Sequence, residues 1–294
     1  MTLTMRIPES ELIINGDGSA FHIHLRPEEL AERVIVFGDP GRVDMAAGFL
    51  EDKEFRHESR EFVAITGKYN GKRITLLSTG IGTDNIDIVM TELDGLANID
   101  FATRTPRAEH RTLNIVRIGT SGGLQPYVPV GTSVIAAKAI GFDGVVNYYA
   151  DRNKVADLDF EKKFCEFVKW NELFAKPYVV DADPWLVEKI GRDDMVRGYT
   201  ISAVGFYGPQ GRQVRLELAE PQLNSRIEKF EYNGGHITNY EMESSALQGL
   251  AAMLGHRAMT VCSIIANRVA TDVNPNYKTA VEDLVKTVLD RLTE

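Results

Sequence analysis

Three short apolar, β-branched runs, each followed at once by a glycine-rich segment, constrain the fold of this chain more than any other feature. The runs are Val34–Phe37 before GDPGR, Ile74–Leu77 before STGIG, and Ile115–Ile118 before GTSGG. Continuous apolar runs of this length are typical of strands that are buried on both faces of a sheet. The pattern therefore predicts buried strands that end in glycine turns, and these turns are expected to form a site.

Helical spacing of apolar residues separates these strands. Within residues 85–97, Ile86, Val89 and Leu93 recur at intervals of three and four, which predicts an amphipathic helix. After Pro275, one helical face carries Val281, Leu284, Val285, Val288, Leu289 and Leu292, and predicts a closing helix on the sheet. Further helices are expected over residues 159–174 and 242–254. The alternation of strand, helix and strand predicts an α/β fold.

The chain is expected to form one domain over residues 1–294, with residues 1–20 as an N-terminal extension. Its 294 residues contain no Pro/Ser-rich linker and no internal repeat. The polar segment from Asp100 to Arg111 is interpreted as an exposed connection.

Composition limits the environment and the partners. The absence of a long apolar run or a signal-like start predicts a protein of the cytoplasm with no membrane partner. The two cysteines, Cys165 and Cys262, have no metal-like spacing and are expected to be reduced structural thiols. A net charge of -9 without a basic run argues against a nucleic-acid partner, whereas a few local arginines can still hold a small anion.

Arginines stand beside two of the glycine segments. Arg42 ends GDPGR and Arg117 precedes GTSGG. A glycine turn alone indicates only a tight connection, but exposed backbone N–H groups together with a guanidinium fork suit phosphate oxygens. The two segments together favour an anion site.

The segment Gly80–Asn85 gives a rival interpretation. It follows a strand and opens a helix, as a dinucleotide-binding GxGxxG motif does, but Asn85 stands where the third glycine is needed. A nicotinamide-dependent dehydrogenase is therefore kept only as a weaker alternative. No Walker A motif is present, so ATP-dependent phosphoryl transfer has little support.

Histidine spacing suggests a metal site only weakly. In FHIH, an extended backbone would put His22 and His24 on one side, yet neither an HExxH motif nor clustered Cys/Asp partners accompany them. The remaining histidines are isolated in polar contexts and are interpreted as surface or structural residues: His57, His110, His236 and His256. No metal site is predicted.

Two further segments carry groups suited to a nucleoside. In NYEMES, Glu241 and Glu243 flank Met242; one glutamate there is explained by a helix N-terminus, but carboxylates also accept from paired sugar hydroxyls. In FYGPQGR, Phe206, Gln210 and Arg212 offer a stacking face, an amide and a cation, although the segment could equally be a surface loop.

Taken in order, these segments resemble the nucleoside phosphorylases of the uridine phosphorylase branch. The resemblance runs from about Phe21 to the C-terminus and rests on FHIHL, GDPGR, SREF, STGIG, RIGTSGG, FYGPQGR, NYEMES and IIANR. It implies a central mixed β-sheet flanked by helices. It also implies phosphorolysis of uridine, and possible acceptance of deoxyuridine, to uracil and ribose 1-phosphate, without a cofactor beyond the co-substrate phosphate.

The resemblance also implies a role for each matching residue. Phosphate would be held by Gly38, Arg42, Arg117, Thr120 and, from a neighbouring subunit, Arg60. The ribose would contact Met242 and Glu243, with His22 from the neighbour near its 5′-hydroxyl. Uracil would be surrounded by Phe206, Gln210, Arg212 and Arg268. The catalytic set would be Arg117, Gln210, Arg212 and Glu243.

Departures from the bacterial hexameric members favour a homodimer with shared active sites. The GIGTDN loop differs from theirs, and residues 100–111 look like an insertion. Those members hold a monovalent cation between subunits near the position of Glu61; Asn85, which replaces a serine, leaves that ion undecided. Asn267-Arg268 stands where purine-specific relatives usually carry an aspartate, which favours a pyrimidine base.

Two further alternatives share the same pocket. A non-catalytic nucleoside-binding protein would need no catalytic arginines, and a nucleosidase that uses water would need no arginine phosphate cage. Both are less consistent with Arg42, Arg60 and Arg117 together.

Overall fold

A twelve-stranded mixed sheet forms the centre of the molecule. The computed structural model describes residues 6–267, 272–273 (backbone only) and 277–294. The sheet order is β11-β12-β10-β8-β13-β7-β1-β4-β3-β2, with β9 beside β8 and β14 beside β13. The strands are β1 Arg33–Phe37, β2 Asp52–Ser59, β3 Phe62–Tyr69, β4 Lys72–Ser78, β7 Asn114–Gly123, β8 Ser133–Gly141, β9 Tyr178–Asp181, β10 Val196–Ser202, β11 Glu231–Tyr232, β12 Gly235–Glu241, β13 Arg257–Asn267 and β14 Asp272–Val273. A separate two-stranded hairpin consists of β5 Ile99–Asp100 and β6 Thr105–Pro106.

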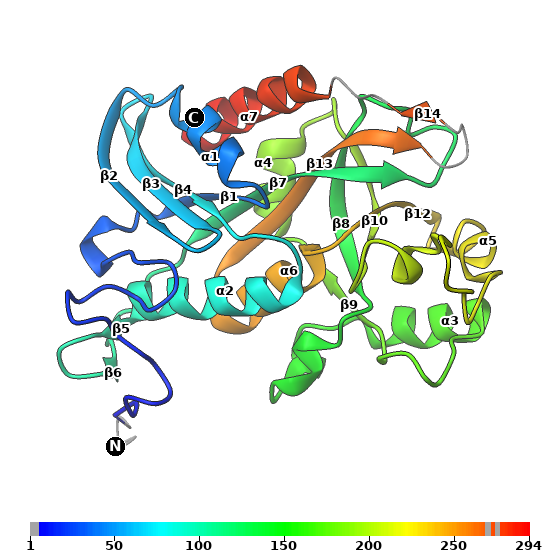
Figure 1. Ribbon diagram of the computed structural model, residues 1–294, viewed down its shortest axis with the longest axis horizontal. Helices are drawn as coiled ribbons and strands as arrows, with labels where there is room; N and C mark the ends of the chain where they lie inside the picture. The colour runs from blue at the N-terminus through cyan, green and yellow to red at the C-terminus, as the bar shows by residue number, and fades with distance from the viewer. Residues whose placement is uncertain (1–5, 268–271, 274–276) are drawn as a thin grey trace.

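Helices cover both faces of this sheet (Figure 1). They are α1 Pro40–Ala47, α2 Thr83–Asn98, α3 Leu158–Val168, α4 Pro184–Gly191, α5 Leu223–Ile227, α6 Ser244–Leu254 and α7 Lys278–Thr293. In this view α1, α4 and α7 lie above the sheet and α2 and α6 below it, while α3 and α5 lie at one end. Short 3-10 turns occupy Pro27–Glu29, Val145–Tyr148, Arg152–Lys154 and Gly208–Gln210. The predicted α/β fold, a mixed sheet flanked by helices, is confirmed.

The apolar pattern of the sequence explains the layers. All six apolar residues predicted for the closing helix are buried in α7, where they pack with α1, α4 and the sheet. On the opposite face, Ile86, Val89 and Leu93 of α2 join α6 in a second core. A third core, rich in aromatic rings, lies between α3 and the end of the sheet near β12. Full burial of a leucine or isoleucine side chain contributes about 1.5–3 kcal/mol, so these faces fix where the helices lie.

Five strands of the sheet close on themselves. Strand β7 pairs with β13, and the pairing continues through β8 and β10 to β12. Strand β12 pairs back with β7 at Gly122 and Gly123. The closure brings the ends of β7, β10 and β12 together, and several residues predicted for the site lie on β7 or in the segments that follow β10 and β12.

The predicted element limits need three corrections. Residues 119–123 lie within β7 and not in a turn. Helix α3 ends at Val168, before the predicted Phe174, because Lys169 adopts a left-handed conformation. The segment from Asp100 to Arg111 is not simply exposed, since Arg104 is buried and donates to the carbonyls of Ile7, Pro8 and Leu12.

Among the described residues, none of the helices has both the length and the apolar character needed to cross a bilayer.

Candidate active site

The first two glycine segments lie side by side at the ends of β1 and β4. Strands β1 and β4 are parallel and in register, and the N–H of Thr79 donates to the Phe37 carbonyl at 2.7 Å. A Cβ on Gly38 would lie 3.4 Å from the Gly80 carbonyl oxygen, so the backbones are in close contact. Beyond Gly38, Asp39 caps α1 and places Arg42 in its first turn. An anion at this helix N-terminus would meet backbone N–H groups and a guanidinium.

Arg117 lies inside the protein, paired with both glutamates of NYEMES. Its Nη1 is 3.1 Å from Glu241 Oε2, and its Nη2 donates to Glu243. The second oxygen of Glu243 accepts from the backbone N–H of Gly82 at 2.8 Å. Three predicted features therefore meet at one point: the end of β12, the arginine of β7 and the glycine segment before α2.

Gly119 makes room for this arginine. A Cβ at Gly119 would lie 2.5 Å from Nη1 of Arg117 and 3.0 Å from Sγ of Cys262. The glycine-rich segment therefore admits the guanidinium between strands, rather than forming the predicted turn. Pairing with β13 along its whole length keeps the segment extended.

The cluster holds two carboxylates and one cation away from water. Burial opposes the charge of Arg117, yet Glu243 and Glu241 together hold the pKa of Arg117 above its ordinary range. Burial raises the pKa of Glu243 to about 7, against the attraction of Arg117 and with the repulsion of Glu241. Burial likewise raises the pKa of the Cys262 thiol to about 12, so Cys262 is a neutral neighbour. Burial is therefore the main reason why the pKa of Glu243 lies above its ordinary value, and the nearby Glu241 carboxylate adds to it.

The sequence indicates Glu241 only as one of two carboxylates suited to sugar hydroxyls, with no role of its own, yet it organises this cluster. It accepts from the backbone N–H groups of Glu243 and Ser244 and from the hydroxyl of Ser202 at 2.5 Å. It thus satisfies the N-terminus of α6 and faces Arg117 at the same time. The Glu-X-Glu spacing directly before a helix was the only sequence signal for this role.

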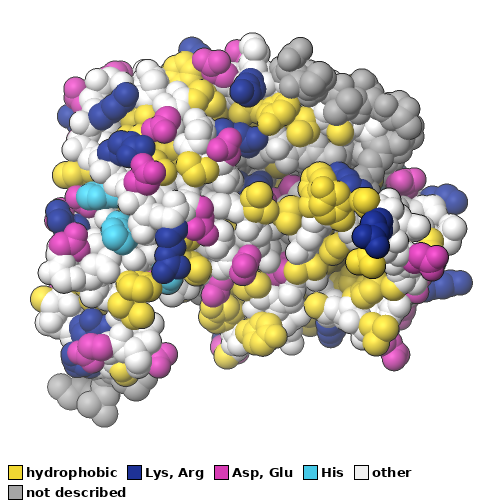
Figure 2. Space-filling view, viewed as in Figure 1, with side chains coloured by type: hydrophobic (Ala, Val, Ile, Leu, Met, Phe, Trp, Pro, Cys, Tyr) yellow, Lys and Arg dark blue, Asp and Glu magenta, His cyan; other side chains and the backbone are white. Residues whose placement is uncertain are grey.

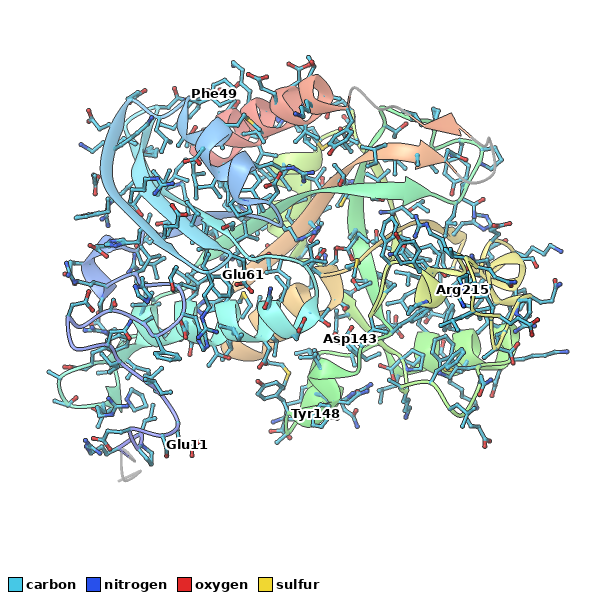
Figure 3. The ribbon with its side chains drawn as sticks, in the orientation of Figure 1. Glu11, Phe49, Glu61, Asp143, Tyr148 and Arg215 are labelled. Carbon is cyan, nitrogen blue, oxygen red and sulfur yellow. The ribbon has the colours of Figure 1, made fainter. Side chains whose placement is uncertain are left out.

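A network of hydrogen bonds supports Glu241 through Ser202. The N–H of Ser245 donates to Ser202 Oγ at 2.9 Å, and Ser245 Oγ donates to Asp143 at 2.9 Å. Tyr178 donates to the same carboxylate at 2.9 Å. Figure 3 shows Asp143 near the lower edge of the sheet, beyond β8. Sequence reasoning missed these residues because nothing in their local spacing marks them.

Phe206, Gln210 and Arg212 are brought together as predicted. Arg212 donates to Gln210 Oε1 at 2.5 Å, and its guanidinium lies 3.9 Å from the centre of the Phe206 ring. We call residues 204–212 the base loop. It follows β10 directly, and there Ala203 N–H donates to the Glu241 carbonyl at 2.9 Å. The base loop therefore starts beside the glutamate cluster.

A second residue missed from the sequence fastens the base loop. Asn224, in α5, donates to the Gln210 carbonyl at 3.0 Å and accepts from the Tyr240 hydroxyl at 2.9 Å. Tyr240 immediately precedes Glu241, so Asn224 ties the base loop to the strand that carries the glutamates. Arg268, the fourth residue predicted for the base, lies outside the described residues.

The other predicted phosphate and sugar residues have fewer contacts. Thr120 and Met242 are half-buried, in β7 and between Glu241 and Glu243. Arg60 is exposed at the β2–β3 turn, with a left-handed φ of 54°. The adjacent Glu61 accepts from the amide of Asn85 at 3.1 Å, and Figure 3 shows it just above α2. The role of Arg60 stays a prediction, and the binding of a cation near Glu61 stays undecided.

His22 and His24 do not share one side of an extended strand. The segment Phe21–Ile23 is a turn, and His24 has a φ of 54°. His22 is instead bound to Glu92 of α2 through Nδ1 at 2.5 Å. The condition for the alternative metal site is therefore not met.

A second histidine cluster lies at the far end of α2. Asp94, His110 and His256 place their ligand atoms within 4.8 Å of one another, so these histidines are not isolated as predicted. The Leu113 N–H donates to Nδ1 of His256 at 3.1 Å, which leaves Nε2 to carry a proton and donate to Asp94. His110 Nε2 faces the Leu254 carbonyl at 2.9 Å. Hydrogen bonds through Nε2 of both histidines therefore join this cluster to Asp94 and to the Leu254 carbonyl.

An apolar cavity of about 780 Å³ borders the other side of the base loop. It lies between Tyr207 and Arg212 of the loop and Phe142, Trp170 and Leu223 of the body. Figure 2 shows hydrophobic side chains gathered over this part of the molecule. The cavity does not include Arg117 or Glu243, so it lies beside the charged cluster and not within it.

Comparisons with known proteins show the family of the chain. The model of a family described as the phosphorylase superfamily matches residues 32–293. The uridine phosphorylase of Haemophilus influenzae is 31% identical over 91% of this chain and 94% of its own length. The chain belongs to the nucleoside phosphorylase family. The resemblance drawn from the eight motifs is thereby confirmed.

Both branches of the family are among the relatives. A DeoD-type purine nucleoside phosphorylase of Listeria welshimeri is 28% identical over 83% of this chain and 85% of its own length. Among solved structures, a Trypanosoma brucei nucleoside phosphorylase described as showing uridine phosphorylase activity superimposes with a TM-score of 0.84. It is 27% identical, and the match covers 96% of this chain and 99% of that one.

Proposed function

We propose that this protein is an enzyme that catalyses the reversible phosphorolysis of uridine to uracil and ribose 1-phosphate. The observation that carries the proposal is the base loop. Arg212 is stacked on Phe206 and bound to Gln210, directly beside the strand end that holds Glu241 and Glu243. A planar base with carbonyl and imide edges needs a stacking face, an amide and a cation of this kind. The uridine phosphorylase activity named for the Haemophilus relative supports the same substrate.

The proposed chemistry needs no covalent intermediate with the protein. A phosphate oxygen forms a bond to the anomeric carbon while the bond from that carbon to the uracil nitrogen breaks. The bonding pair leaves with the uracil ring, which Gln210 and Arg212 would stabilise more strongly as its negative charge grows. Arg42, Arg117 and Arg60 would aim the phosphate, and Glu243 would accept from the ribose hydroxyls.

The wider setting of this activity belongs to the same proposal. A homodimer with shared active sites, a role in pyrimidine salvage and a place in the cytoplasm are the expected context. The exposed position of Arg60, without a hydrogen-bonded partner for its side chain in the described part of the chain, is compatible with a role in a neighbouring subunit.

The decisive experiment follows free uracil from uridine with and without inorganic phosphate, with inosine as the comparison nucleoside. Phosphate-dependent release of uracil, with little release of hypoxanthine, is the expected result. Uracil release that ignores phosphate would indicate a nucleosidase, and a preference for inosine would indicate the purine branch. Nucleoside binding without any turnover would indicate a non-catalytic nucleoside-binding protein.

A further inference from the structure

Helix α2 carries a carboxylate on its buried face. Glu92 is 6% exposed, and its two oxygens accept from the backbone N–H groups of His22 and Ile23, each at 3.0 Å. Its one ion-pair partner in the described part of the chain is the His22 ring, at 2.5 Å from Nδ1. A buried carboxylate is costly unless it is fully hydrogen-bonded, so this arrangement holds the 22–23 turn firmly against α2.

The bond to Glu92 also fixes the chemistry of the ring. When Nδ1–H donates to the carboxylate, the neutral ring presents Nε2 as an acceptor on its opposite side. The rings of Phe21 and Phe62 lie edge-on to His22 at centroid distances of 4.7 and 6.3 Å, and they restrict its rotation. The side chain remains 25% exposed. An acceptor nitrogen with a set direction therefore faces the surface, where a hydroxyl group can reach it.

The same helix links this ring to the sugar cluster. Gly82, which precedes α2, donates to Glu243, whereas Glu92 lies ten residues further along. At 1.5 Å per residue, about 15 Å of helix separates the two points. His22 is thus held well away from the glutamates of its own chain, which favours a role in the pocket of a second copy.

We infer that Glu92 is a positioning residue that orients His22 toward the 5′-hydroxyl of the nucleoside bound by the neighbouring subunit. The inference rests on the proposed function and extends it to a residue that touches no substrate. Glu92 sets which nitrogen of His22 carries the proton and where the other points. Recognition of the 5′-hydroxyl then depends on a carboxylate buried behind the ring.

The test compares uridine with 5′-deoxyuridine, which differs only in that hydroxyl. For the wild-type protein we expect kcat/KM to favour uridine about tenfold, the value of one hydrogen bond. In Glu92→Leu the preference should fall to that of His22→Phe, while kcat/KM for 5′-deoxyuridine changes little. In Glu92→Gln, which keeps a weaker neutral contact, the preference should lie between these values. The double variant Glu92→Gln/His22→Phe should discriminate no less than His22→Phe alone.

Asp87→Asn is the matched control, because it makes the same kind of change on the exposed side of α2, where Asp87 meets Tyr149. Its preference for uridine should equal that of the wild type. A folded Glu92→Leu or Glu92→Gln protein that loses activity equally on both substrates would assign Glu92 a structural role only and overturn the inference. Should Glu92→Leu not fold, the glutamine variant decides alone. A wild-type protein without phosphate-dependent uracil release would instead overturn the proposed function itself.

Discussion

At the scale of single residues, the site depends on a charge imbalance that the protein maintains in its interior. Arg117 faces two carboxylates, and only one of them has a full set of backbone and hydroxyl donors. Glu241 has that set, whereas the partners of the Glu243 carboxylate within the described residues are the Gly82 N–H and the arginine. The carboxylate with fewer donors is the one expected to bind ribose, because its acceptor capacity is not used up by the fold.

The raised pKa of Glu243 leads to a prediction about stability. The folded protein holds this proton with a pKa of about 7, against an ordinary value of 4.5. The stability that the proton contributes is therefore complete below the ordinary value and is lost as pH rises through the folded value. The amide of the Glu243→Gln variant would stay neutral throughout, so in denaturant unfolding the stability of that variant should fall less between about pH 5 and pH 8 than that of the wild type. The difference should be about 1.4 kcal/mol for each unit of pKa shift.

The same variant should lose activity on uridine, because an amide cannot accept with both of its heads. Stability and activity would then change in opposite directions above neutral pH. Parallel stability curves for the two proteins would show that Glu243 is ionised in the fold at all of these pH values. Unchanged kcat/KM would remove Glu243 from the ribose site.

Arg212 allows a test of the base loop at one position. Arg212→Ala removes a charge-assisted hydrogen bond to the leaving base, which should cost about 1.5–3 kcal/mol in the transition state. Steady-state kinetics with uridine should therefore show kcat/KM lower by about ten- to a hundredfold. Arg215→Ala, an exposed arginine of the following segment, provides the control (Figure 3). Equal activity of the two variants would show that Arg212 does not contact the base.

At the scale of elements, β7 joins in one strand two segments that the sequence predicts as a buried strand and a glycine turn. Its apolar half lies in the core, and its glycine-rich half pairs with β13 and β12 and leaves space for the guanidinium of Arg117.

Gly119→Ala should displace the guanidinium of Arg117, since the new Cβ would lie 2.5 Å from Nη1. The expected result is a KM for phosphate raised about tenfold, the equivalent of one weakened charge-assisted bond, in a protein that still folds.

Gly16→Ala is the control for this substitution, because a Cβ at Gly16 meets nothing within 4 Å. Thermal unfolding and circular dichroism would verify the fold of both variants. Normal phosphate kinetics in Gly119→Ala would mean that Arg117 tolerates the shift, and would argue against a direct contact between Arg117 and phosphate.

Helices in which apolar residues recur at a regular helical spacing were predictable from the sequence. Contacts between elements that are distant in the sequence were not. The face of α7 and that of α2 follow from apolar spacing, because burial alone determines which side faces the sheet. The closure of β12 onto β7 depends instead on pairing between strands over a hundred residues apart. Glu241 reaches Arg117 of β7, and Asn224 joins the base loop to Tyr240, through contacts between distant segments that local pattern does not reveal.

The same limit explains the errors. The sequence predicts a turn at GTSGG because glycines usually interrupt strands, but here a neighbouring arginine needs the space of the missing side chain. The sequence predicts an exposed connection around Arg104 because the segment is polar, yet carbonyls of the N-terminal segment accept from this arginine. Both errors arise from tertiary contacts that override a local preference.

At the scale of the whole molecule, the phosphate site is expected to need arginines from two chains. Arg42 belongs to the chain that carries Gly38, whereas Arg60 extends from the β2–β3 turn and is expected to serve a neighbour. Arg117→Ala would leave two buried glutamates unpaired, which typically destabilises a protein by about 3–5 kcal/mol. Arg42 is half-buried and lies outside that cluster, so its removal is expected to affect the stability of the protein less than removal of Arg117.

The last prediction is that Arg42→Ala and Arg60→Ala are each nearly inactive alone and regain activity when mixed. In a mixed dimer, one pocket would contain both arginines and the other would contain neither. Random exchange gives half mixed dimers, so about a quarter of the wild-type activity should return. Exchange would be verified by native mass spectrometry of differently tagged chains, and uracil release would be measured before and after it. If verified mixed dimers stay inactive, both arginines serve the same chain's pocket. A fully active monomer would rule out shared sites altogether, because Arg60 would then need no second subunit to reach the phosphate.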